Sequence, residues 1–280
     1  MKLANVPLVV IRGAGDLASG VAYRLFLAGY PIVMTELECP TFVRRMVCFG
    51  NAMYESPFTV EGITARKIDI HSALWLAVQE REIPIVLDAE QSWRDLSPQV
   101  IVDARMAKHN IDTSYEDAPL VIALGPGFEA GQDCHAVIET NRGHYLGRVI
   151  WRGCAEPNTG TPGAVMGHTQ GRVLRAPKDG FVSSVVNIGD WLEANELIAM
   201  IDDVEIRAPF DGRLRGIIHP SVHVVKGMKI GDLDPRGIRE HCFTISDKSL
   251  AIGGGVLMAV LQSGILPYRH FIGRFNDATG

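Results

Sequence analysis

Three small residues near the start of the chain have the spacing of a phosphate-binding loop. Gly13, Gly15 and Ala18 follow a buried apolar run and open a helical pattern, which is the setting that a dinucleotide-binding loop requires. Glycine allows a tight turn, and the amide groups at a helix N-terminus can hold a phosphate. Asp16 lies inside this loop, and its carboxylate would repel a phosphate unless it turns away or caps the helix. We expect the loop to bind a phosphorylated ligand, with an empty scaffold as the alternative.

Further candidates for ligand binding follow other predicted strands. Glu36 lies near the end of the second strand, where an acid can accept hydrogen bonds from a ribose. Gly125 and Gly127 follow an apolar strand directly, and ligands of open α/β sheets usually enter beside such strand ends, although a simple turn would use the same residues. The residues assigned to cofactor binding are Gly13, Gly15, Asp16, Ala18, Glu36, Gly125, Gly127 and Arg142.

One predicted turn gathers side chains that could do acid–base chemistry. Glu139, Arg142 and His144 surround this turn and could transfer a proton or bind an anion. A solvated hairpin tip is the alternative interpretation of the same residues.

Polar side chains also stand at the ends of later predicted strands. Asp88, Asp103 and Arg105 lie at or just past strand ends, so their side chains could converge on the crevice beside the glycine loop. Acids in such positions often only cap helices or hold loops. The candidates for catalysis are Asp103, Glu139 and His144.

No pattern in the sequence predicts a metal site. His219 and His223 are four residues apart, but Pro220 prevents the helix that would align them as ligands. The five cysteines are scattered and form no CxxC motif, which argues against a zinc site or a disulfide framework.

The elements that must position these residues alternate between strand and helix. The chain has continuous apolar runs, which are typical of strands buried on both faces. Segments with the apolar period of a helix lie between these runs. This order predicts an α/β fold with a doubly wound, mostly parallel, Rossmann-like sheet. The expected strands cover 8–11, 31–36, 85–88, 100–103 and 120–123, the expected helices 17–28 and 72–81, and a strand pair is expected at 137–140 and 147–151.

An internal repeat dominates the later part of the chain. RAPKDG at 175–180 recurs as RAPFDG at 207–212, and the offset of 32 residues persists without a gap. Two such copies predict a pseudo-twofold β structure that resembles the barrel-sandwich fold of biotinyl and lipoyl carrier domains. The turn after the second copy has Gly227, where the first copy has Asn195, a residue that tolerates left-handed backbone. The hairpin at 200–204 has no lysine to modify, so a structural or interaction module is expected.

A final helix is predicted from residue 245 to residue 262, with Ser246 or Asp247 as its N-cap. Its Gly253–Gly255 run costs helix propensity, and close backbone packing would explain why it is tolerated. The expected domains are a Rossmann-like domain (1–130), a β-hairpin and connecting segment (131–170), a barrel-sandwich β module (171–236) and a C-terminal helix and tail that pack back on the first domain (237–280).

Composition narrows the class of protein. The 280 residues are 47% hydrophobic and 21% charged with a net charge of −5, which excludes intrinsic disorder and argues against nucleic-acid binding. No apolar run reaches the roughly 18 residues of a membrane span. The first residues read as a strand rather than a signal peptide, because Arg12 and Gly13 follow at once. We therefore expect a cytoplasmic protein, which could form a homo-oligomer.

Five stretches spread over nearly the whole chain carry a family resemblance: ALGPGF (123–128), VIETNRGH (137–144), PNTG (157–160), KIGDLDPR (229–236) and ISDK (245–248). They resemble the YqeB-type accessory proteins of selenium-dependent molybdenum hydroxylases. The first part of the chain also resembles the xanthine dehydrogenase accessory family, which handles molybdenum cofactor. The resemblance implies a maturation factor that serves a molybdenum hydroxylase client, and it assigns no catalytic residue.

Three functions fit these observations. The first is a maturation factor that holds a phosphorylated small molecule, either molybdopterin as molybdenum cofactor or a nucleotide, in the sheet crevice. The second is an NAD(P)-dependent oxidoreductase, for which Asp103 or His144 would have to supply a proton. The third is a ligand-free scaffold, which fits if Asp16 blocks the loop.

Overall fold

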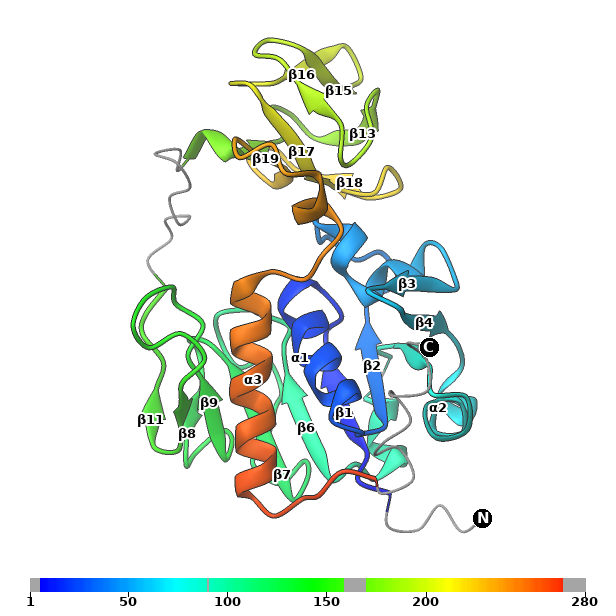
Figure 1. Ribbon diagram of the computed structural model, residues 1–280, viewed down its shortest axis with the longest axis vertical. Coiled ribbons are helices and arrows are strands. Elements are labelled where there is room, and N and C mark those ends of the chain that lie inside the picture. Colours follow the sequence, from blue (N-terminus) through cyan, green and yellow to red (C-terminus); the bar gives the residue numbers. More distant parts are fainter. Residues whose placement is uncertain (1–5, 90, 159–169, 269–280) are drawn as a thin grey trace, which may run out of the picture.

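The computed structural model describes residues 6–89, 91–158 and 170–268, which form a large α/β part and a smaller β part (Figure 1). In these residues the α/β part is built on a nine-stranded sheet with the order β10-β9-β7-β6-β1-β2-β5-β4-β3. All strands between the two edges run parallel, and β10 and β3 at the edges pair antiparallel. The strands are β1 (Val9–Arg12), β2 (Ile32–Glu36), β3 (Phe58–Val60), β4 (Ile63–Lys67), β5 (Ile83–Leu87), β6 (Val100–Asp103), β7 (Leu120–Leu124), β9 (Ala136–Ile138) and β10 (Val149–Ile150).

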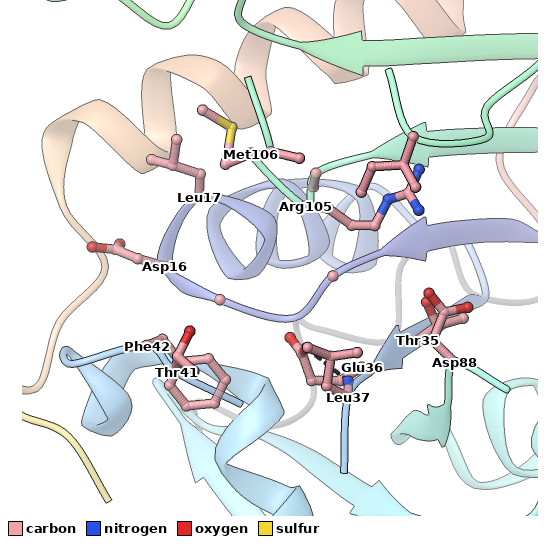
Figure 2. A pocket seen from close by; sticks show the side chains of 15 residues that line it. Asp16, Leu17, Thr35, Glu36, Leu37, Thr41, Phe42, Asp88, Arg105 and Met106 are labelled. Atoms are coloured by element: carbon pink, nitrogen blue, oxygen red, sulfur yellow. Dashed lines mark hydrogen bonds between the residues drawn. The ribbon is translucent and has the colours of Figure 1, made fainter. Parts of the chain in front are cut away.

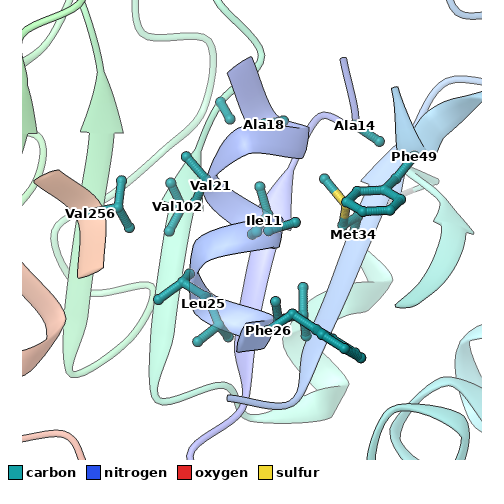
Figure 3. Packing of buried hydrophobic residues seen from close by; sticks show 14 of the residues in the cluster. Ile11, Ala14, Ala18, Val21, Leu25, Phe26, Met34, Phe49, Val102 and Val256 are labelled. Atoms are coloured by element: carbon teal, nitrogen blue, oxygen red, sulfur yellow. The ribbon is translucent and has the colours of Figure 1, made fainter. Parts of the chain in front are cut away.

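Helices cover both faces of this sheet, which explains why its central strands are mostly apolar, with β7 apolar throughout. Val9 and Ile11 of β1 pack against one layer of helices, and Val10 packs against the other, because alternate side chains of a strand point to opposite faces. In Figure 3, Leu25 and Val256, from two different helices, belong to the same cluster as Ile11. The first layer is α1 (Asp16–Leu27) and α3 (Asp247–Gln262), and the second is α2 (Ile70–Trp75), the π-helical turn η3 (Leu76–Glu80) and the 3-10 turn η4 (Ser92–Leu96).

The prediction of a mixed α/β fold with a mostly parallel sheet is confirmed, and the expected buried strands and all three expected helices lie in this part. The β3–β4 hairpin and the 3-10 turns η1 (Arg45–Val47) and η2 (Phe49–Met53) were not expected. These segments are short and mix apolar with polar residues, so no helix or strand period develops in them.

The predicted strand pair after residue 136 is also present, as β9 and β10. Strand β9 pairs in parallel with β7, so this hairpin is part of the large sheet and not a separate segment between the α/β part and the β part. The boundary expected near residue 130 therefore falls inside the sheet. A small two-stranded sheet, β8 (Glu129–Ala130) with β11 (Gly153–Cys154), lies beside it.

Helix α3 lies beside α1, as Figure 1 shows, and glycines allow the close approach. A Cβ on Gly20 of α1 would lie 2.6 Å from the carbonyl carbon of Ser249, and a Cβ on Gly253 would lie 2.9 Å from that of Gly20. A Cβ on Gly255 would collide with the carbonyl oxygen of Gly147, whereas Gly254 faces open space. The helix begins after the N-cap Ser246, whose hydroxyl oxygen accepts a hydrogen bond from the Ser249 amide.

The smaller part, called here the β module, consists of two antiparallel four-stranded sheets that share one apolar core. At the repeat offset of 32 residues, each strand of the first copy coincides with a strand of the second, for example β13 with β17. The corresponding pairs are β12 with β16, β13 with β17, β14 with β18 and β15 with β19. If each strand of the sheet β12-β19-β17-β14 is replaced by its counterpart, the result is the order of the other sheet, β16-β15-β13-β18. Each sheet therefore draws strands from both copies, and neither copy can bury its apolar face alone. The strands are β12 (Val173–Arg175), β13 (Gly180–Ser184), β14 (Trp191–Leu192), β15 (Leu197–Ile201), β16 (Val204–Arg207), β17 (Gly212–Ile217), β18 (His223–Val224) and β19 (Lys229–Asp234).

The two expected left-handed turn positions of the β module are confirmed. Asn195 has φ +70° and its counterpart Gly227 has φ +85°. The 3-10 turn η5 (Gln170–Arg172) precedes the module, and η6 (Arg239–Cys242) leads from it to α3.

The β module packs on the α/β part beside η1. Val43 belongs to the module's core cluster, and a Cβ on Gly216 of β17 would lie 2.5 Å from the Val43 carbonyl oxygen. The rings of Tyr54 and His219 stack across the same contact with centroids 3.8 Å apart. Arg44, from the α/β part, donates to the carbonyl oxygens of His241 and Thr244.

Candidate functional site

A pocket of about 590 Å³ opens at the carboxyl ends of β1, β2 and β6, where the glycine loop leads into α1 (Figure 2). Ligands of parallel α/β sheets bind outside this end of the strands. The pocket is lined by Gly13, Gly15, Asp16, Leu17, Thr35, Glu36, Leu37, Thr41, Phe42, Asp88, Ala104, Arg105, Met106, Ala107 and Ile111.

The loop conformation requires glycine at its first position. Gly13 has φ +94°, and a Cβ there would also press on the backbone of Ala104, 3.1 Å from its carbonyl oxygen. The Gly13 amide donates to the Thr35 carbonyl oxygen at 3.0 Å, which ties the loop to β2. Gly15 has ordinary extended backbone (φ −77°) and is the N-cap of α1, without a side chain to cap the helix.

The carboxylate of Asp16 does not cover the loop amides. Arg44 donates to its Oδ2 at 2.6 Å and Ser249 donates to its Oδ1 at 2.7 Å. Figure 2 shows the side chain directed away from Glu36 and Asp88. Within the described ranges of the chain, the amides of Gly15, Asp16 and Leu17 have no hydrogen-bond acceptor. A helix N-terminus with unoccupied amides therefore borders the pocket.

Glu36 holds the other side of the loop. Its Oε2 accepts from the Ala14 amide and its Oε1 from the Leu37 amide, both at 2.8 Å. Burial raises the pKa of Glu36, the two amides oppose this, and the charge of Asp88 adds to the rise. Each carboxylate oxygen can accept a second hydrogen bond, so Glu36 can still receive a ligand hydroxyl.

A buried ionic network beneath the pocket fixes Arg105, which lines it. Arg12, 1% exposed at the end of β1, donates to both oxygens of Asp112 at 2.7 and 3.0 Å. Arg105 contacts Asp112 at 2.7 Å and donates to Asp103 at 2.6 Å, and Thr113 also donates to Asp103. The hydrogen bond from Arg12 is the largest of the effects that hold the pKa of Asp112 well below its usual range. Asp103 is thus a buried support for Arg105 and does not line the pocket.

The other residues of the expected cofactor site lie elsewhere. Ala18 is buried in the core under the loop. Gly125 (φ +73°) and Gly127 (φ +104°) allow close packing of their loop against Thr140 and the backbone around Lys108, outside the pocket lining.

The structure does not bring the three residues of the β9–β10 turn to the pocket. Glu139 is 2% exposed, and its two oxygens accept from the amides of Asn141 and Glu156 at 2.6 and 2.8 Å, so it stabilises the local backbone. Arg142 forms a bidentate pair with Asp247 of α3 at 2.9 and 3.2 Å. His144 is exposed, with its ring edge-on to Tyr145.

Sequence reasoning missed the apolar and hydroxyl side chains of the pocket. Thr35 had a usable signal, because it precedes Glu36 at a strand end. The segment after β2 and the loop after β6 have no period, and only the fold brings them to the glycine loop. The missed lining residues are Leu17, Thr35, Leu37, Thr41, Phe42, Ala104, Met106, Ala107 and Ile111.

Fold and site define a mixed α/β protein with a ligand-sized pocket at the carboxyl edge of its sheet, joined to a repeated β module. The chain is 52% identical over 257 residues, 91% of its length, to the uncharacterized protein YqeB of Escherichia coli (strain K12). The match covers 47% of YqeB, so the chain spans about half the length of this relative. This similarity supports the resemblance to the YqeB family that the motifs indicated.

Two further comparisons add no functional information. No family model matches the chain. A crystal structure of an aspartoacylase family protein from Mesorhizobium loti aligns with 81% of this chain and 83% of its own, at 9% identity and a TM-score of 0.26, which is too low to support an argument. None of the helices in the described residues is both long and apolar enough to cross a membrane.

Proposed function

We propose that the chain is an accessory factor in the maturation of a molybdenum hydroxylase of the selenium-dependent type, and that it binds a phosphorylated ligand in the strand-end pocket. The α/β part would act as a Rossmann-like binding domain and the β module as a barrel-sandwich module that contacts the client enzyme. The motif resemblance supports the choice of system, and the identity to the uncharacterized protein YqeB supports the family to which those motifs point. The proposed site of action is the cytoplasm.

One observation carries the ligand-binding proposal: Arg44 and Ser249 hold the Asp16 carboxylate away from the loop. Among the described residues, the first amides of α1 therefore have no acceptor, and they border a pocket of about 590 Å³. Those amides and the positive end of the helix dipole suit a phosphate. If the Asp16 carboxylate capped α1 instead, it would occupy these amides and leave no place for a ligand phosphate.

The remaining lining suits the rest of a nucleotide- or pterin-like molecule. Leu37, Phe42 and Ile111 supply apolar surface on which a flat ring can pack, and Leu37 and Ile111 are 58% and 55% exposed at the pocket. Glu36 and Asp88 offer carboxylate oxygens to ligand hydroxyl or amino groups. Molybdenum cofactor, as cargo, and a dinucleotide both have the required phosphate and ring.

A substitution at the helix cap tests this site without removing a contact. Gly15 already has extended backbone, and a Cβ there would meet only Phe42, at 3.8 Å. In Gly15→Asp, the new carboxylate should cap α1 and occupy the free amides, because Asp is a favoured N-cap. We expect unchanged or slightly higher thermal stability together with at least about tenfold weaker binding, which corresponds to roughly 1.4 kcal/mol. Gly15→Ala, which adds a Cβ without a charge, is the control and should bind within about threefold of the wild type.

The binding assay is calorimetric titration with molybdopterin, CTP, NAD(H) and NADP(H). Saturable binding of one of the first two that is lost in Gly15→Asp supports the proposal. Nicotinamide binding with substrate turnover would replace it with an oxidoreductase, and binding of none of the four would leave a scaffold. The maturation role has its own test: cells that lack the gene should lose molybdenum hydroxylase activity, and Gly15→Asp should not restore it.

A further inference from the structure

A second crevice of about 430 Å³ lies between the β module and the start of α3. It shares no lining residue with the strand-end pocket. Arg44 stands between the two, because it pairs with Asp16 of the first pocket and donates to the His241 and Thr244 carbonyl oxygens of the second. The lining of the second crevice is Arg215, Arg236, His241, Thr244, Ile245, Ser246 and Asp247.

Both arginines of this crevice have unused hydrogen-bond donors. Arg215 has a side chain only 11% exposed, and its Nε donates to the His241 carbonyl oxygen at 3.1 Å. The nearest carboxylate oxygens, of Asp234 and Asp232, are 3.8 and 3.9 Å away, beyond hydrogen-bond distance. Arg236 directs Nε and Nη2 to Asp234. In the part of the chain that the structure describes, the terminal nitrogens of Arg215 and the Nη1 of Arg236 have no acceptor.

The acids nearby are already occupied by other bases. Asp234 is 2% exposed and bonded to Arg236, and the Asp247 carboxylate is bridged by Arg142. Burial is the main cause that lowers the pKa of Arg215, and the positive charge of Arg44 adds to it. The nearby carboxylates oppose this shift without cancelling it. A buried cation with unused donors is stabilised by an anion that satisfies them.

His241 adds a third polar group to the crevice. Its Nδ1 is buried and has no hydrogen-bond partner among the described residues, while its carbonyl oxygen accepts from Arg215 and Arg44. The imidazole of this lining residue therefore keeps an unused hydrogen-bonding nitrogen.

We propose that the crevice between the β module and the start of α3 binds a small oxyanion of the phosphate class, held by the free guanidinium nitrogens of Arg215 and Arg236. Planar guanidinium groups match the spacing of phosphate oxygens, and two of them converge here. Its volume leaves room for the organic part of a phosphate ester. Since the arginines belong to the β module and the lining beyond residue 240 leads into α3, the bound anion ties these two elements together.

The test is a calorimetric titration of the whole chain with inorganic phosphate and, separately, with glycerol 3-phosphate. Arg215→Lys and Arg236→Lys keep the positive charges beside Asp234 but lose the guanidinium fork, so each should weaken binding by about tenfold without unfolding the chain. Arg207→Lys is the matched control, because Arg207 is an exposed arginine of the same module that pairs with Glu205. It should bind as the wild type does.

Gly15→Asp separates this inference from the proposed function. Phosphate binding that persists in Gly15→Asp and weakens in the two lysine variants supports the second crevice as the site. Binding that disappears in Gly15→Asp but survives in both lysine variants places the anion in the first pocket and overturns the inference. Absence of saturable binding of either probe to the wild type overturns it as well. Comparable affinities for the two probes identify a free-phosphate site, and preference for glycerol 3-phosphate identifies an ester site.

Discussion

The glycine run of α3 offers a sharp test of how the two long helices pack. Gly253 and Gly254 are neighbours in one helix, but Gly253 faces the backbone of Gly20 and Gly254 faces open space. We predict that alanine raises the free energy of unfolding at position 254 but not at position 253.

The magnitudes follow from propensity and contact. Replacing glycine by alanine within a helix gains roughly 1 kcal/mol at either position. A Cβ at 253 would lie 2.9 Å from the Gly20 carbonyl carbon, whereas ordinary contacts lie at 3.4–4 Å, so the helices would have to separate. Such overpacking costs about 1–3 kcal/mol, and a backbone carbonyl cannot rotate out of the way. Gly254→Ala should therefore stabilise the chain by about 1 kcal/mol, and Gly253→Ala should be about 1–3 kcal/mol less stable than Gly254→Ala.

The assay is equilibrium urea unfolding of the wild type and both variants, followed by circular dichroism. Because propensity contributes equally to both variants, their difference isolates the helix–helix contact. Equal stabilities of Gly253→Ala and Gly254→Ala would refute the close packing of α1 and α3. Displacement of α3 should also weaken ligand binding in Gly253→Ala, since Ser249 of this helix holds Asp16.

Two other predictions concern the charges around the loop. Arg44→Met should lower the free energy of unfolding by about 3 kcal/mol, which is the low end for a broken buried pair because the Asp16 side chain is 29% exposed. Adding Asp16→Asn to the same chain should recover part of this loss. Strictly additive effects in this double-mutant cycle would contradict a direct interaction between the two side chains. Burial raises the pKa of Glu36, so its carboxyl group holds a proton more tightly in the folded chain than in the unfolded chain. The stability that this protonated group contributes is fully present below its ordinary pKa of 4.5 and is lost as the pH rises through the pKa of the folded chain. Wild-type stability relative to Glu36→Gln, measured by urea unfolding at a series of pH values, should therefore fall with rising pH over this interval, and a rise would contradict the burial of the carboxylate.

Much of the architecture could be predicted from the sequence because it depends on local periodicity. Continuous apolar runs located β1, β2, β5, β6 and β7, and the repeat located the strands of the β module. Side-chain chemistry within a few residues predicted the left-handed turn at Asn195 and limited the N-cap of α3 to Ser246 or Asp247, of which the structure has Ser246. The β3–β4 hairpin escaped detection because both strands are short and of mixed polarity and therefore have no such period.

The site was only partly predictable, because its properties depend on partners far away in the chain. Sequence spacing identified Gly13, Gly15, Asp16 and Glu36, which line the pocket. The same reasoning also selected Arg142, which instead pairs with Asp247, 105 residues further on.

Sequence alone determined that a glycine loop joins a buried strand to a helix, since tight turns and amphipathic periods are properties of neighbouring residues. Only the tertiary structure decided whether that loop can receive an anion. The direction of the Asp16 carboxylate depends on Arg44, 28 residues away, and on Ser249, 233 residues away. A charged side chain turns to whichever partners the folded chain places within hydrogen-bond distance, and no local pattern encodes those partners.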